Sequence, residues 1–204
     1  MAKVTLLLWD VGGVLLTNAW DRAGRAAAAA RFHLDPAELE RRHDRVADDF
    51  ETGRMDLDRY LAATVFDVPR AFDAGAFRAF MWSLSAPHES ALACARAFRQ
   101  DGTFVMVALN NESTELNEHR ISTFHLREVF HAFLSSCYTG RRKPDPDAYR
   151  YALQVTQHLP EETLFLDDRP ENVEAAARLG IRAVRVRDPV RVREELESAG
   201  VVAG

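Results

Sequence analysis

The sequence has little cysteine, no long apolar run and no excess of positive charge. Its two cysteines, Cys94 and Cys137, form no CxxC pair, which argues against a disulfide framework and leads us to expect a reducing, cytoplasmic location. No apolar run approaches the roughly 20 residues that a membrane-spanning helix needs. The apolar segment at residues 4–9 is too short for a signal peptide and is followed by an aspartate, so we interpret it as a buried strand.

The charge balance narrows the classes of partner. The net charge is −5 at pH 7, whereas a nucleic-acid-binding surface usually carries a basic stripe. The same balance argues against anionic membranes as partners. The histidines show no HExxH or similar metal-binding spacing. Apolar residues make up 47% of the 204 residues, which is enough for one core domain with a smaller insert. We expect the protein to be a monomer or a homodimer.

Hydrophobic periodicity divides the chain into a helical segment and a segment in which strands and helices alternate. Between residues 18 and 83 the sequence predicts only helices, at 23–32, 36–51, 56–66 and from Pro69 to residue 82. Asp35 and Pro36 have the residue types of an N-cap and a first helical position. We therefore expect a small all-helical cap at 18–83, inserted into a core formed by 1–17 and 84–204.

The core segment predicts an α/β fold. Apolar β-type runs at 4–9, 103–109, 132–135, 163–166 and 181–186 alternate with helical patterns at 88–100, 113–119, 145–157, 170–179 and 190–198. Repeated strand–helix units favour a doubly wound parallel sheet with right-handed crossovers. Continuous apolar runs, such as the first, are typical of strands buried on both faces of such a sheet.

Polar side chains follow several of these strands. Asp10 comes after the first strand and Asn110–Asn111 after the second. Lys143 lies shortly after the third strand and Asp167–Asp168 after the fourth. In an open α/β sheet, ligands bind beyond the carboxyl ends of the strands. We therefore expect these side chains to form one site.

This combination of side chains has a chemical meaning. Three carboxylates close together repel one another unless a cation neutralises them. Mg²⁺ prefers a few carboxylates together with carbonyl and water oxygens. With Mg²⁺ and Lys143 present, Asp10 can attack a phosphoryl group and form an aspartyl phosphate that water then hydrolyses. A helical insert directly after the loop that carries Asp10 is well placed to exclude water as a lid.

Four segments resemble the motifs of the haloacid dehalogenase superfamily, in the family's order. They are Trp9–Leu15, Leu109–Asn111, Lys143–Tyr149 and Phe165–Asn172. The helical stretch is similar to the small cap of the subgroup that includes α-D-glucose-1-phosphate phosphatase and the N-terminal phosphatase domain of soluble epoxide hydrolases. The resemblance covers nearly the whole chain and implies a Rossmann-like core.

The resemblance also implies a role for each matching residue. Asp10 is the expected nucleophile and Lys143 the charge-balancing lysine. Asn110 and Asn111 are the expected phosphate-binding residues. The expected Mg²⁺ ligands are Asp10, the backbone carbonyl of Gly12, Asp167 (directly or through water) and Asp168.

Two residues depart from the family's pattern. Most phosphatases of the family have an acid-base aspartate where this chain has Gly12, and loss of a general acid typically slows a reaction by ~10²–10⁴-fold. We therefore expect slower catalysis, substrates with good leaving groups, or another acid, for which Glu112 is a candidate. Asn110 stands where a serine or threonine usually holds a phosphoryl oxygen.

Three functions follow from these observations. The first is a Mg²⁺-dependent phosphatase acting on a small phosphorylated metabolite such as a sugar phosphate or a nucleotide. The second is a 2-haloacid dehalogenase, which also uses an aspartate nucleophile and agrees with Gly12 but needs no Mg²⁺. The third is a non-catalytic or weakly active binding or regulatory protein that retains the fold.

Other side chains are weaker candidates. Trp20 is the aromatic residue of the insert that best fits a place in the substrate pocket. Arg141 and Arg142 flank the lysine, either as phosphate contacts or as exposed loop charges. Cys94 lies in an apolar helical stripe, and we expect it in the core rather than in catalysis.

Overall fold

The computed structural model describes residues 2–203. Its centre is a five-stranded parallel sheet in the order β3-β2-β1-β4-β5. The strands are β1 (Leu6–Trp9), β2 (Val105–Ala108), β3 (Ala132–Phe133), β4 (Thr163–Asp167) and β5 (Arg182–Arg185). The predicted parallel α/β fold is therefore confirmed.

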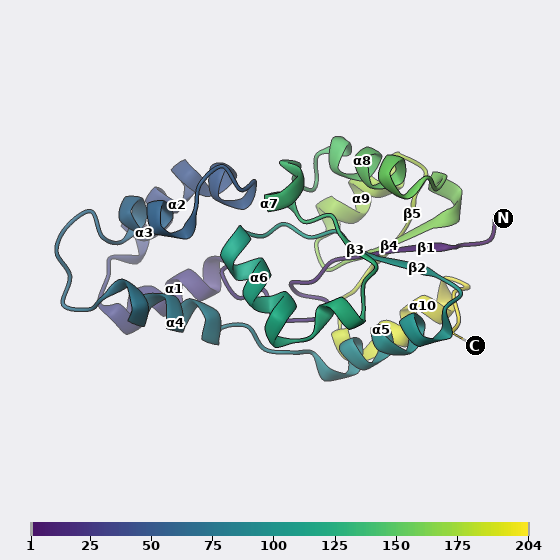
Figure 1. The fold of residues 1–204 in the computed structure, drawn as a ribbon, viewed down its shortest axis with the longest axis horizontal. Helices are drawn as coiled ribbons and strands as arrows, with labels where there is room; N and C mark the ends of the chain where they lie inside the picture. Colours follow the sequence, from purple (N-terminus) through teal and green to yellow (C-terminus); the bar gives the residue numbers. More distant parts are fainter. Residues whose placement is uncertain (1, 204) are drawn as a thin grey trace.

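Helices cover both faces of the sheet (Figure 1). Successive residues of β1 point to opposite faces, so Leu7 and Trp9 pack in one hydrophobic core while Leu6 and Leu8 pack in another. The first core includes residues of α5 (Glu89–Asp101), α6 (Thr114–Thr123) and α10 (Val192–Ser198). The second includes residues of α8 (Pro146–Thr156) and α9 (Pro170–Arg178). All four residues of β1 are buried, as their apolar sequence predicts.

Four helices form the segment between β1 and α5. They are α1 (Arg22–Phe32), α2 (Pro36–Glu51), α3 (Leu57–Thr64) and α4 (Ala74–Ser83). Their buried side chains form a separate hydrophobic cluster, to which the core domain adds Leu116. In Figure 1 this insert lies at one end of the molecule, and both chain termini lie at the other. The domain limits at 17/18 and 83/84 stay predictions.

Aspartate N-caps determine where the insert helices begin. The carboxylate of Asp35 accepts hydrogen bonds from the backbone of Ala37 and Glu38, as the Asp-Pro pair predicts. The fourth helix, expected directly after Pro69, begins only at Ala74 because Asp73 caps it. The expectation that this helix follows Pro69 directly is therefore wrong.

Short elements complete the chain, and the sequence patterns did not indicate most of them. They are the helix α7 (Ser136–Thr139) and the 3-10 turns η1 (Leu126–Glu128), η2 (Pro160–Glu162) and η3 (Pro189–Arg191). A single helical turn is too short to show a hydrophobic period. Within residues 2–203, none of the helices is both long enough and apolar enough to cross a membrane.

Candidate active site

The register of the two central strands brings the first two acidic residues together. Trp9 of β1 pairs with Leu166 of β4, so the next residues, Asp10 and Asp167, emerge side by side at the carboxyl edge of the sheet. The backbone N–H of Asp10 donates to the Leu166 carbonyl at 2.9 Å and continues the ladder. The predicted meeting of these side chains follows from strand pairing.

Asp10, Asp167 and Asp168 form an acidic cluster with Lys143 at its centre. One carboxylate oxygen from each aspartate lies within 4.8 Å of the others. The Lys143 ammonium lies 3.0 Å from Asp10 Oδ1 and 2.6 Å from Asp167 Oδ2. Lys143 and Asp167 are almost fully buried, and Asp10 is 7% exposed. The site therefore holds a buried, partly neutralised group of charges.

Burial and neighbouring charges shift the pKa values in this cluster. Burial raises the pKa of Asp10 well above its ordinary value, although Lys143 opposes the shift. Burial likewise raises the pKa of Asp168. Burial disfavours the charged form of Lys143, but Asp10 and Asp167 outweigh this effect, and the pKa of Lys143 is raised. The lysine is therefore a permanent cation, while the acidic group is short of positive charge.

One carboxylate oxygen of Asp168 has no hydrogen-bond partner within residues 2–203. Its Oδ2 accepts a hydrogen bond from Asn18 Nδ2 at 3.2 Å, whereas its buried Oδ1 accepts none. The turn at Gly13 leaves space for this carboxylate, because a Cβ on Gly13 would lie 2.2 Å from Asp168 Oδ2. An unpartnered buried carboxylate oxygen beside two other carboxylates fits the donor set of a hard divalent cation.

Asp167 is held rigidly by its neighbours. Asn172 Nδ2 donates to both of its oxygens at 3.0 Å, and the backbone N–H of Arg169 donates to Oδ1 at 2.9 Å. Together with Lys143, these donors satisfy most of the lone pairs of Asp167. This carboxylate is thus the most fully paired of the three.

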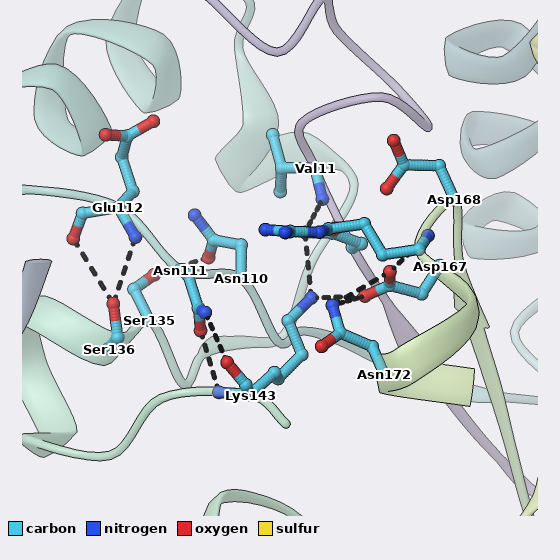
Figure 2. Close-up of polar contacts among 12 residues, drawn as sticks. Val11, Asn110, Asn111, Glu112, Ser135, Ser136, Lys143, Asp167, Asp168 and Asn172 are labelled. Carbon is cyan, nitrogen blue, oxygen red and sulfur yellow. Dashed lines mark hydrogen bonds and ion pairs between the residues drawn. The ribbon is translucent and has the colours of Figure 1, made fainter. Parts of the chain in front are cut away.

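The two asparagines after β2 face different neighbours (Figure 2). Asn111 clamps the backbone of Lys143: its Oδ1 accepts from the lysine N–H at 2.9 Å, and its Nδ2 donates to the lysine carbonyl at 2.7 Å. Asn110 is buried, donates to Asn117 Oδ1 at 3.1 Å and accepts from Ser135 Oγ at 2.7 Å. Each amide nitrogen retains a second hydrogen, so phosphate binding by these residues stays a prediction.

Glu112 and Arg120 form a buried ion pair beside Gly12. The Arg120 guanidinium lies 2.9 Å from Glu112 Oε2, and a Cβ on Gly12 would lie 3.6 Å from the same guanidinium nitrogen. Burial raises the pKa of Glu112 to about 7, although Arg120 opposes the shift. With Asp10 and Lys143, these residues line a cavity of about 60 Å³.

A larger cavity of about 530 Å³ lies between the insert and the core. Glu112 and Asp168 line its core side, and Trp20 lines its insert side. That this cavity is the substrate pocket stays a prediction. Arg142 also lines it, while its guanidinium pairs with Glu51 at 2.7 Å. Arg141 instead stacks over the Tyr151 ring at 4.3 Å, outside this cavity.

Asn18 and Arg120 carried no recognised signal in the sequence, whereas Asn172 ends the fourth motif segment but was given no role. Asn18, Arg120 and Asn172 contact Asp168, Glu112 and Asp167 respectively. Arg120 lies on the buried face of α6 with Leu116 and Ile121, and a charged residue at a helical spacing from apolar residues was the available signal. Cys94, expected in the core, is buried there.

Comparisons with known proteins identify the family of this chain and several relatives. Residues 4–180 match the haloacid dehalogenase-like hydrolases. Bifunctional epoxide hydrolase 2 of Sus scrofa is 26% identical over 208 residues, which covers 93% of this chain and 38% of that protein. The sesquiterpene phosphatase astK of Aspergillus oryzae is 26% identical over 150 residues, which covers 72% and 75% of the two chains.

The fold is also found among solved structures. The HAD family enzyme BT-2542 of Bacteroides thetaiotaomicron superposes with a TM-score of 0.79 at 18% identity, covering 90% of this chain and 94% of that one. The chain spans less than two fifths of the length of the epoxide hydrolases of Rattus norvegicus and Sus scrofa that it matches. Because the family match extends over most of its length, the chain belongs to the haloacid dehalogenase-like hydrolases.

Proposed function

We propose that this hydrolase is a Mg²⁺-dependent phosphatase that acts on a small phosphorylated metabolite through an aspartyl phosphate on Asp10. The observation that carries the proposal is the acidic cluster around Lys143, in which Asp168 Oδ1 is buried without a partner among the described residues. Asp10, Asp168 and the Gly12 carbonyl, with Asp167 directly or through water, would hold Mg²⁺. That ion screens negative charge and orients phosphoryl oxygens.

The first step forms a bond between a carboxylate oxygen of Asp10 and phosphorus, while the bond from phosphorus to the leaving oxygen breaks. Lys143 touches Asp10 Oδ1 at 3.0 Å and stabilises charge on the nucleophile and on the phosphoryl group. The Val11 N–H donates to the same oxygen at 2.7 Å and fixes the carboxylate. Both contacts orient the second oxygen of Asp10 for attack.

The leaving oxygen needs a proton, and we propose Glu112 as its source. Glu112 lines both the small cavity that contains Asp10 and the larger cavity below the insert. A pKa of about 7 leaves much of Glu112 protonated near neutral pH. In the second step, water attacks the aspartyl phosphate, and the deprotonated Glu112 accepts its proton. Inorganic phosphate and free Asp10 result.

Relatives and neighbouring structures support the reaction class. The sesquiterpene phosphatase astK aligns over most of both chains, and a flavin mononucleotide hydrolase of Arabidopsis thaliana is 36% identical over 69 residues. BT-2542 has been solved in complex with magnesium and inorganic phosphate, in a structure that superposes with a TM-score of 0.77. We also propose a cytoplasmic location, which suits the free cysteines Cys94 and Cys137.

A panel of phosphate esters tests this proposal. Wild type should hydrolyse one or more of them with Mg²⁺ and lose that activity in EDTA, and Asp10→Asn should be inactive under both conditions. Asp35→Asn is the matched control, because Asp35 only caps α2 and asparagine is an equally good cap. Full activity of Asp10→Asn would refute the nucleophile assignment.

The phosphate-ester panel, together with an assay of halide release from 2-haloacids, separates the alternative functions. Gly12 favours a 2-haloacid dehalogenase, which would release halide from a 2-haloacid and would keep its activity in EDTA. Failure to turn over any ester, despite measurable Mg²⁺ binding, would instead favour a binding or regulatory role. The unpartnered Asp168 Oδ1 favours the phosphatase, because it provides a ligand for a cation that the dehalogenase reaction does not use.

A further inference from the structure

Three insert residues at the larger cavity, two on its wall and one behind them, form a chain of hydrogen bonds. Trp20 Nε1 donates to the Tyr60 hydroxyl at 2.8 Å, and the same hydroxyl lies 2.9 Å from His43 Nδ1. Trp20 and His43 line the cavity, whereas Tyr60 is fully buried behind them. None of the three takes part in the proposed phosphoryl transfer.

The donors and acceptors in this chain fix the tautomer of His43. An indole N–H can only donate, so the Tyr60 oxygen accepts from Trp20 and retains one hydrogen to give. Within residues 2–203, His43 Nδ1 is the one acceptor found for that buried hydrogen. His43 Nδ1 must therefore accept, and the ring proton resides on Nε2.

The imidazole is both neutral and rigidly placed. Burial lowers the pKa of His43 to about 4, and the positive charge of Arg25 adds to this effect. Phe50 stacks on Tyr60 with ring centroids 3.9 Å apart, and Trp20 and His43 pack against Tyr60 edge to face. A hydrogen-bonding group that is held in place by packing loses little entropy when it binds a ligand.

Among the residues that the structure describes, none accepts a hydrogen bond from His43 Nε2–H. The Nε2 atom also retains some exposed surface. Nε2 therefore reaches solvent, and the solvent beside His43 is that of the larger cavity. The result is a fixed, neutral hydrogen-bond donor on the insert side of the proposed substrate pocket.

The surrounding groups indicate what such a donor would bind. Asp44 lies beside His43 on the cavity wall, and its carboxylate is able to accept hydrogen bonds from hydroxyl groups of a ligand, while Trp20 supplies an aromatic surface. Three of the four arginines that line the cavity are already paired, Arg25 with Glu40, Arg142 with Glu51 and Arg169 with Glu171, and the fourth, Arg22, lies next to Asp21 in the lining. This wall therefore suits neutral hydroxyl groups better than a second anion or a long hydrocarbon chain.

We propose that His43 is a specificity-determining residue, whose Nε2–H donates to a hydroxyl oxygen on the leaving group of a sugar or polyol phosphate. This inference rests on the proposed phosphatase function and narrows its substrate class. The Trp20–Tyr60 pair acts as a positioning device that keeps the proton on Nε2.

The test compares kcat/KM for hexose and glycerol phosphates with kcat/KM for phenyl phosphate, which has no hydroxyl group on its leaving group. Loss of one hydrogen bond worth about 1.4 kcal/mol corresponds to about tenfold. His43→Leu should therefore lower the polyol-to-phenyl ratio about tenfold, mainly through KM. His43→Gln, which carries an amide N–H near the position of Nε2, should restore most of the ratio.

Two further variants separate recognition from folding. Tyr60→Phe removes the hydroxyl group that fixes the tautomer of His43. Although residue 60 does not contact the substrate, this substitution should lower the polyol-to-phenyl ratio of kcat/KM. His119→Leu is the matched control, because His119 is a half-buried histidine outside both cavities, and its ratio should equal that of wild type. Thermal unfolding of each variant shows whether it is folded.

The possible outcomes are distinguishable. An unchanged ratio in folded His43→Leu overturns the role of His43, even if phosphatase activity is intact. A polyol-to-phenyl ratio that falls as much in His119→Leu as in His43→Leu also overturns the role of His43. If wild type hydrolyses no phosphate ester with Mg²⁺, the proposed function fails and this inference fails with it.

Discussion

At the residue scale, the site depends on one ammonium group between two carboxylates. Lys143 lies within 3.0 Å of both Asp10 and Asp167, and all three are buried. Burying these charges is costly, and the cost is offset because each faces an opposite charge. The lysine therefore supports the stability of the fold as well as the proposed chemistry.

Replacing Lys143 should affect both properties. Lys143→Met leaves two neighbouring carboxylates without their cation, so we expect activity to fall at least ~10²-fold and the free energy of unfolding to fall by about 3 kcal/mol. Urea unfolding and steady-state kinetics measure these changes. Lys3→Met, at the chain's other lysine, which is exposed, should change neither. Equal effects of the two substitutions would contradict the account.

The proposed role of Glu112 as the acid can be tested with phosphate esters that differ in their leaving groups. If Glu112 protonates the leaving oxygen, Glu112→Gln should slow hydrolysis of alkyl phosphates by ~10²-fold or more and slow aryl phosphates with acidic leaving groups far less. The measurement is kcat across a series of esters of graded leaving-group pKa. A uniform reduction across the series would show that Glu112 is not the acid.

The raised pKa of Glu112 also predicts a pH effect on stability. Burial raises this pKa to about 7 from an ordinary 4.5. Between these values the folded chain binds more protons than the unfolded chain, so the contribution of Glu112 to stability decreases as the pH rises and levels off above about 7. Relative to Glu112→Gln, wild type should lose up to about 3 kcal/mol between pH 5 and pH 8. Parallel stability curves for the two proteins would argue against the shift.

At the element scale, the turn after β1 sets the geometry of the site. Gly13 has a φ of +74°, which only glycine adopts easily, and a Cβ there would lie 2.2 Å from Asp168 Oδ2. Gly13→Ala should therefore displace Asp168, weaken Mg²⁺ binding and lower activity, which titration calorimetry and kinetics measure.

A second glycine provides the matched control for this turn. Gly102 at the end of α5 has a φ of +76°, but its Cβ position is open. Gly102→Ala should cost a similar ~1–2 kcal/mol of backbone strain and leave activity unchanged. If both variants lost activity equally, backbone strain rather than Asp168 would be responsible.

Most helices and strands were predictable because their signals are local. Asp35 and Asp56 each cap the helix that the sequence places after them. The start of α4 was not predicted, because the apolar residues before Asp73 have a pattern that is typical of a helix. In the structure these residues form a loop, in which Phe66 and Phe72 lie against the Phe77 ring. Tertiary packing decided that boundary.

At the scale of the whole molecule, topology made part of the site predictable. Asp10 and Asp167 meet because parallel strands end at one edge, a rule that needs only the order of elements. The partners of Asn110 and His43 depend on side-chain packing between distant segments, as in the contact of Asn110 with Ser135. Spacing along the chain carries no information about such contacts.

Metal binding should be visible in the stability of the entire protein. A ligand that binds only the folded state adds about 2.7 kcal/mol at one hundred times its Kd. Saturating Mg²⁺ should therefore raise the Tm of wild type by several degrees, and EDTA should reverse the increase. Asp168→Asn should show no increase. If saturating Mg²⁺ does not change the Tm of wild type, the proposed metal site is wrong.

The central claim is that Asp10 itself becomes phosphorylated. Acid quenching during turnover with Mg²⁺, followed by peptide mass spectrometry, tests this claim most directly. We predict the added mass of one phosphoryl group on the peptide that contains Asp10, with the group located on Asp10 and absent in EDTA. A substrate that is turned over while Asp10 never carries phosphate, or while another residue carries it, would contradict the account.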